Sequence, residues 1–216
     1  MAATYLIKLL SIAVAIPGGW IATLLIRREV VPLRVRMAPV LAASMLLGLW
    51  AALVMPNLLL LAITLGLAWA LLVLGSIDLL AFRLPDLLTL PLTAVGLLIA
   101  VKLPDNDPIA HFAGAALGFA ALYGIAVAYR GIRGREGLGL GDAKLAAAAG
   151  AWLGWRPLPA VLLIACAAAF IAIGIGFARR GRNVLVEEIA FGAPLCLAFW
   201  IVWISSTSGL YAEIAF

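Results

Sequence analysis

The chain has 216 residues, of which 66% are hydrophobic even before its 21 glycines are counted, whereas apolar residues with glycine included make up about 45–50% of a soluble protein. Charged residues amount to 12%, about half the soluble average, which is too few to cover a soluble domain of this size. These numbers exclude a soluble globule, a disordered chain, a collagen and a coiled coil.

Eight apolar segments, bounded by charged residues, proline or asparagine, follow one another along the chain. Crossing about 30 Å of hydrocarbon takes about 20 helical residues, and most of these segments reach or approach that length. We therefore predict an all-α polytopic membrane protein, a single membrane domain over residues 1–216 with about eight transmembrane helices. The predicted helices cover residues 4–26, 38–55, 58–82, 86–103, 109–129, 142–155, 158–178 and 188–207.

The basic residues predict the orientation of these helices. When alternate junctions are assigned to alternate sides of the membrane, twelve of the 15 Lys and Arg residues fall on one side. Cytoplasmic loops carry the excess of Lys and Arg, so this side is predicted to be cytoplasmic and both termini non-cytoplasmic. The formal net charge of +5 then follows from topology, and we expect no nucleic-acid partner. The other side holds only Lys8, Lys102 and Arg156.

Asp78 is the first of two aspartates at the edge of a predicted span. It lies one helical turn before the predicted cytoplasmic end of the 58–82 segment, about 7 Å inside Arg83 at about 1.5 Å per residue. A carboxylate in hydrocarbon costs about 2.5–3.5 kcal/mol or more, and ionisable groups there mark functional sites by default. The alternative is an interfacial carboxylate that pairs with Arg83 or reaches water.

Asp142 is the second aspartate, and it follows a loop with glycines at positions 134, 137, 139 and 141. The segment that it begins, 142–155, would form a helix of about 21 Å, shorter than the bilayer. We therefore expect the loop to dip into the membrane and its glycines to let another chain approach closely. The alternative is an ordinary aspartate at a helix N-terminus.

Both aspartates fall on the predicted cytoplasmic side of the membrane. Two carboxyl groups within a few ångströms cannot both ionise at low cost, so they share a proton. One can then activate water while its protonated partner polarises a peptide carbonyl, as in aspartic proteases. This chemistry needs no metal and no cofactor, and we predict neither. The single histidine, His111, and the isolated Cys166 and Cys196 give no zinc or redox pattern.

Two segments resemble those of the type IV prepilin peptidases, which are membrane aspartic proteases of the GxGD type. Residues 139–144 read GLGDAK and resemble that family's G-x-G-D-x-K motif. Residues 83–91 read RLPDLLTLP and, following Asp78, resemble its D…R-[IL]-P-[ND]-x-L-T-L-P segment. Residues 188–194 are similar to an E-[IV]-P-F-G-P pattern, with one substitution and one inserted alanine, and no role is assigned to them.

The resemblance implies a peptidase core over about 58–178 in which Asp78 and Asp142 are the catalytic pair. It implies cleavage of the leader peptide of type IV prepilins or pseudopilins by a multi-pass protein of the inner (plasma) membrane, with the site facing the cytoplasm. The implied partners are the leader with its following hydrophobic helix, and the lipid bilayer; no oligomeric state is implied. Loop or substrate-binding roles fall to Gly139, Gly141 and Lys144.

Two departures and two alternatives complete this interpretation. Bifunctional members carry a cytosolic insertion linked to N-methylation, whereas the loop at about 27–36 is short and lacks cysteine, so we expect the short form of the peptidase. Asp86 matches the family's Asn/Asp position and is not implied to be catalytic. A presenilin-like intramembrane protease would use the same two aspartates, and Lys144 disfavours it. A non-enzymatic transporter or assembly protein would use them as proton or cation sites.

Overall fold

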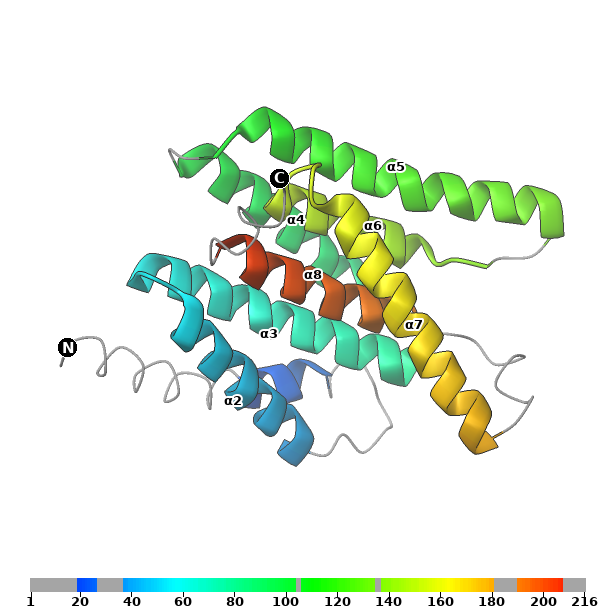
Figure 1. The fold of residues 1–216 in the computed structure, drawn as a ribbon, viewed down its shortest axis with the longest axis horizontal. Coiled ribbons are helices and arrows are strands. Elements are labelled where there is room, and N and C mark those ends of the chain that lie inside the picture. Colours follow the sequence, from blue (N-terminus) through cyan, green and yellow to red (C-terminus); the bar gives the residue numbers. More distant parts are fainter. Residues whose placement is uncertain (1–18, 27–36, 104–105, 135–136, 181–189, 208–216) are drawn as a thin grey trace.

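The computed structural model describes residues 19–26, 37–103, 106–134, 137–180 and 190–207. Every regular element within these ranges is helical, which confirms the predicted all-α class (Figure 1). A short helix covers residues 19–26. The others are α2 (Met37–Val54), α3 (Leu58–Ala81), α4 (Asp86–Lys102), α5 (Pro108–Arg133), α6 (Leu140–Leu153), α7 (Leu158–Arg180) and α8 (Gly192–Thr207).

The bounds of α2 to α8 lie within four residues of the predicted segments. The largest differences are at the end of α5, which continues to Arg133 instead of 129, and at the start of α8, which begins at Gly192 instead of 188. The first predicted segment is described only over 19–26. Both chain termini and the loop at 27–36 lie outside the described residues, so the orientation of the termini stays a prediction.

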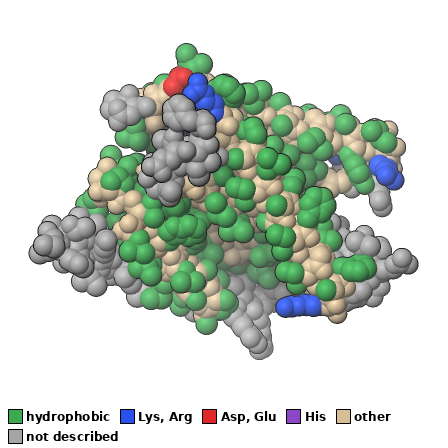
Figure 2. All heavy atoms as spheres, in the orientation of Figure 1, with side chains coloured by type: hydrophobic (Ala, Val, Ile, Leu, Met, Phe, Trp, Pro, Cys, Tyr) green, Lys and Arg blue, Asp and Glu red, His purple; other side chains and the backbone are tan. Residues whose placement is uncertain are grey.

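Many side chains on the exterior of the bundle are hydrophobic, as expected of a surface in contact with lipid. Leu58–Ala81, Pro108–Arg133 and Leu158–Arg179 are the described helices long and apolar enough to cross a bilayer, and Ala38–Val54 and Gly192–Thr207 are shorter apolar helices. The most apolar stretches of α5 and α7 are only 17% buried. Figure 2 shows hydrophobic side chains over most of one face, with the few Lys and Arg side chains near its periphery. The total of eight spans stays a prediction.

Local capping explains where α3 and α5 begin and end. The side chain of Asn57 accepts a hydrogen bond from the Leu60 N–H at 2.8 Å, and that of Asp107 accepts one from the Ile109 N–H at 3.0 Å. The chain leaves α3 through Phe82, a non-glycine residue in the left-handed region with φ of 51°. This sharp turn ends α3 within one helical turn of Asp78 and directs the chain back towards α4.

α6 lies inside the bundle, where it contacts α4, α5, α7 and α8. Small residues make this position possible. A Cβ placed on Gly114 of α5 would lie 2.5 Å from the carbonyl oxygen of Gly150, and one on Gly118 would clash with the carbonyl of Ala146. The backbones of α5 and α6 therefore touch almost directly, a mode of packing that small residues allow in membrane proteins.

Tryptophans connect α6 and α8 to the helices on either side. The indole N–H of Trp152 donates to the carbonyl of Leu92 at 2.8 Å, and that of Trp203 donates to the hydroxyl of Thr64 at 3.0 Å. The two indole rings meet edge to face, with centroids 5.3 Å apart. In Figure 1, α3 and α8 run side by side through the middle of the molecule. α3, α8, α6 and α4 are thus held in a fixed order.

Replacing Gly114 by alanine is expected to destabilise the protein by about 1–3 kcal/mol, because the added Cβ overlaps main-chain atoms that cannot rotate away. Gly124→Ala, on the same helix, is the matched control, since no atom lies within 4 Å of its Cβ position; it should be neutral or stabilise by up to about 1 kcal/mol. Thermal unfolding of both variants in detergent measures the difference. Equal shifts would contradict the close α5–α6 contact.

Candidate active site

Asp78 lies in the last turn of α3 and is only 4% exposed. Its main-chain carbonyl accepts from the Phe82 N–H at 2.9 Å, in the bond that ends the helix. Its neighbours Leu74 and Ile77 are fully buried. The structure therefore places Asp78 inside the bundle and not at its surface.

Asp142 lies in the first turn of α6 and is 8% exposed. The helix begins at Leu140, two residues earlier than predicted, so Asp142 does not open the helix. Gly139 is the residue that caps it, without a side-chain hydrogen bond. The first-turn position of Asp142 is what the alternative of an ordinary aspartate at a helix N-terminus predicts, and the burial of its side chain is what goes beyond that alternative. A Cβ on Gly139 would lie 3.3 Å from the Oδ2 of Asp142, so the loop backbone passes close to the carboxyl group.

The two carboxyl groups, 64 positions apart in the sequence, lie near each other in space. Gly192 packs against both the Asp78 carboxyl group and Leu84. Leu84 in turn packs against Gly141, the residue before Asp142. The thiol of Cys196, buried in α8, experiences the charge of both aspartates. The end of α3, the beginning of α6 and the beginning of α8 therefore meet at one place.

The N-terminus of α8 is a third part of this site. The main-chain N–H of Ala193 donates to the Oδ2 of Asp78 at 2.8 Å. A Cβ on Gly192 would lie 2.9 Å from the Cγ of Asp78, so only glycine lets the helix start so close. Helix N-termini have unpaired N–H groups and a partial positive charge. The sequence had left residues 188–194 without a role; a glycine opening an apolar helix was the signal present there.

Leu84 fills the space between the aspartate-bearing segments. Its side chain is 9% exposed and lies against two glycines at once. A Cβ on Gly141 would be 2.8 Å from the Cβ of Leu84, and one on Gly192 would be 2.9 Å from its Cδ1. Gly141 thus permits the close approach of this chain's own loop between α3 and α4; the approach of another chain stays a prediction.

Lys144 forms an ion pair with Asp86. Its Nζ lies 2.6 Å and 2.7 Å from the two carboxylate oxygens of Asp86, at the start of α4. The Lys144 side chain is 21% exposed and that of Asp86 58%. Two residues along a helix correspond to a rotation of about 200°, so Lys144 and Asp142 leave α6 on opposite sides. The ion pair fastens α6 to α4 while Asp142 faces inward.

No group of three or more His, Cys, Asp or Glu side chains arranged to hold a metal occurs in the part of the chain that the structure describes. His111 lies with its Nδ1 3.0 Å from the carbonyl oxygen of Ala151, a contact between α5 and α6. Cys166 is exposed on α7, apart from the aspartates.

The ion pair between Lys144 and Asp86 should contribute about 0.5–1 kcal/mol to stability, since it is bidentate but partly exposed. A double-mutant cycle with Asp86→Asn and Lys144→Met, followed by unfolding in detergent at low and high salt, measures this coupling. We expect it to fall as salt rises. Strictly additive effects of the two substitutions would show that the contact does not contribute.

Comparisons with known proteins agree with the two motifs. The model of the type IV leader peptidase family matches residues 65–177, a stretch that contains Asp78, Leu84, Asp86, Asp142 and Lys144 and ends before α8. No solved structure matches.

Three curated relatives illustrate the range of the similarity. The prepilin leader peptidase/N-methyltransferase of Aeromonas salmonicida is 40% identical over 133 residues, which cover 59% of this chain and 44% of the relative. That of Burkholderia pseudomallei is 45% identical over 109 residues, or 50% of this chain and 35% of the relative. The leader peptidase HopD of Escherichia coli is 39% identical over 128 residues, or 58% of this chain and 82% of the relative.

The chain thus spans less than half the length of the Aeromonas and Burkholderia relatives it matches, and most of the Escherichia coli one. The family model covers more than half of its 216 residues and includes both predicted motifs. On these grounds the chain belongs to the type IV leader peptidase family.

Proposed function

We propose that this chain is a membrane-embedded aspartic endopeptidase that cleaves the leader peptide from type IV prepilins or pseudopilins. The observation that carries the proposal is the meeting of two buried carboxyl groups, Asp78 and Asp142, from the two motif segments of the matched region. Buried acids without a functional reason are costly, and a close pair of them is the arrangement by which aspartic proteases hydrolyse peptides.

In the proposed reaction the two aspartates have different tasks. An ionised carboxylate takes a proton from water as the water oxygen attacks the scissile carbonyl, and a protonated carboxyl donates a hydrogen bond to the carbonyl oxygen. The Ala193 N–H and the N-terminus of α8 stabilise negative charge on Asp78. We therefore assign the base to Asp78 and the proton donor to Asp142. The proton taken from water later passes to the leaving amine.

The surroundings of the pair suit a polypeptide that arrives from the cytoplasm. Arg130 and Arg133 lie at the end of α5, on the side that the distribution of Lys and Arg predicts to be cytoplasmic. α3 ends and α6 begins at the aspartates, so both carboxyl groups belong to that side. The proposal therefore places the protein in the inner (plasma) membrane, with the site open to leaders on the cytoplasmic face, and its substrate as a short leader followed by an apolar helix.

Replacing either aspartate by asparagine should lower the rate of leader cleavage by at least about 100-fold, because asparagine neither accepts the proton from water nor supplies one. The measurement is the conversion of a co-expressed prepilin to its shorter form. Asp107→Asn is the matched control, since asparagine caps the N-terminus of α5 as well as aspartate does, and cleavage should be unchanged. Normal cleavage by Asp78→Asn or Asp142→Asn would overturn the assignment of that residue.

A further inference from the structure

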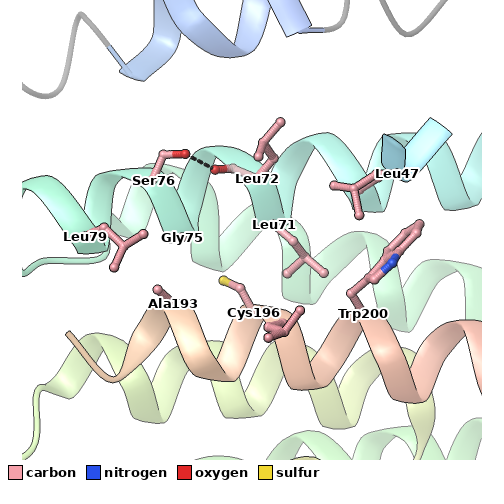
Figure 3. A pocket seen from close by; sticks show the side chains of 11 residues that line it. Leu47, Leu71, Leu72, Gly75, Ser76, Leu79, Ala193, Cys196 and Trp200 are labelled. Atoms are coloured by element: carbon pink, nitrogen blue, oxygen red, sulfur yellow. Dashed lines mark hydrogen bonds between the residues drawn. The ribbon is translucent and has the colours of Figure 1, made fainter. Parts of the chain in front are cut away.

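A groove of about 210 Å³ runs along the contact between α3 and α8, with Leu47 of α2 at its far end (Figure 3). Its walls are almost entirely apolar. The hydroxyl of Ser76, which lines it, donates to the carbonyl of Leu72 at 2.6 Å within the same helix. The α3 side extends from Ala68 to Leu79, which is about 16 Å along a helix axis and matches three helical turns of a bound segment.

The near end of this groove is at the aspartates. Ala193 lines it and donates its main-chain N–H to Asp78. Cys196, also in the wall, lies within electrostatic reach of both carboxyl groups. In Figure 3, Ala193 and Leu79 lie towards one end of the groove and Leu47 and Trp200 towards the other. A chain that leaves the aspartates along this groove therefore passes into the apolar interior of the bundle.

The continuity of the groove with the aspartates indicates its occupant. Ala193 both lines the groove and donates to Asp78, so a segment bound here can be the continuation of a chain whose peptide bond lies at the carboxyl groups. A lipid acyl chain has no such connection to a peptide bond. The apolar walls favour an apolar segment of that polypeptide.

We infer that the groove between α3 and α8 is the subsite for the apolar segment that follows the scissile bond of the substrate, an inference that rests on the proposed function. The segment would enter beside Asp78 and occupy about 16 Å of α3. Substrate selection then depends on residues outside the catalytic pair. Ser76 and Cys196, in the two facing walls, set how large the bound side chains can be.

A second groove, of about 390 Å³ between α3 and α4, is larger. Its α3 wall covers residues 62–70, so it ends eight positions, or about 12 Å, before Asp78. Gly66 lines this second groove and faces open space. It provides a control position on the same helix, outside the inferred subsite.

The kinetic test compares Ser76→Leu with Gly66→Leu. Filling the inferred subsite should raise KM for a prepilin at least about tenfold with a smaller change in kcat, because the apolar segment loses its binding surface. A peptide that keeps the scissile bond but ends two residues after it cannot fill the groove, so Ser76→Leu should raise KM for this peptide much less than for the prepilin. Gly66→Leu should leave both constants within about twofold. An unchanged KM for Ser76→Leu, or an increase confined to Gly66→Leu, would overturn the inference.

Crosslinking gives a readout that does not depend on turnover. In an Asp142→Asn protein that also carries Cys166→Ala and Cys196→Ala, Ser76→Cys should form a disulfide with a cysteine placed in the apolar segment of the prepilin. Gly66→Cys should form several-fold less. Equal or reversed yields would overturn the inferred subsite. If the wild-type protein cleaves no prepilin at all, the proposed function fails; if it cleaves normally but these results are absent, only the subsite fails.

Discussion

The contact on which the site depends is the hydrogen bond from the Ala193 N–H to the carboxylate of Asp78. A carboxylate removed from water needs a donor to replace its hydration, and here the first turn of α8 supplies it. That donor can reach Asp78 only because residue 192 is glycine, and it stays in place because Leu84 fills the remaining space against both Gly192 and Gly141. The burial of one acid thus fixes the positions of three separate segments.

The parallel contact between α4 and α6 is the second constraint. At one end Lys144 pairs with Asp86, and further along the indole of Trp152 donates to Leu92, so both helices run in the same direction from the site. α5 connects them and packs between them and the exterior through its glycines. Because α6 is fixed at two points along its length, Asp142 has little freedom to turn away from Asp78. Lys144 and Asp86 have no chemical role in the proposed reaction, but their ion pair helps to fix the geometry of the catalytic pair.

Helix positions could be predicted from the sequence because apolar runs and their Pro, Asn and Arg boundaries are local signals. The two aspartates could be predicted because ten acidic residues in so apolar a chain can be considered one by one. The role of α8 could not, since a main-chain N–H carries no residue-specific signal and Ala193 lies 115 positions from Asp78. The partner of Lys144 was missed for the same reason: its location depends on how α4 and α6 pack. The start of α6 at Leu140 instead of Asp142 reflects a helix that begins without a side-chain cap.

Because the N-terminus of α8 contributes to the site, a fragment of the chain without α8 would lack part of the site. The stretch shared with the family model ends at residue 177, within α7, and it contains both acids and the two motif segments, 83–91 and 139–144. A polypeptide that stopped there would keep its sequence signature but would leave Asp78 facing apolar side chains with neither the Ala193 donor nor the wall formed by Cys196 and Trp200. The motif segments alone therefore do not make the site complete; the N-terminus of α8, which lies beyond the matched stretch, supplies the Ala193 donor.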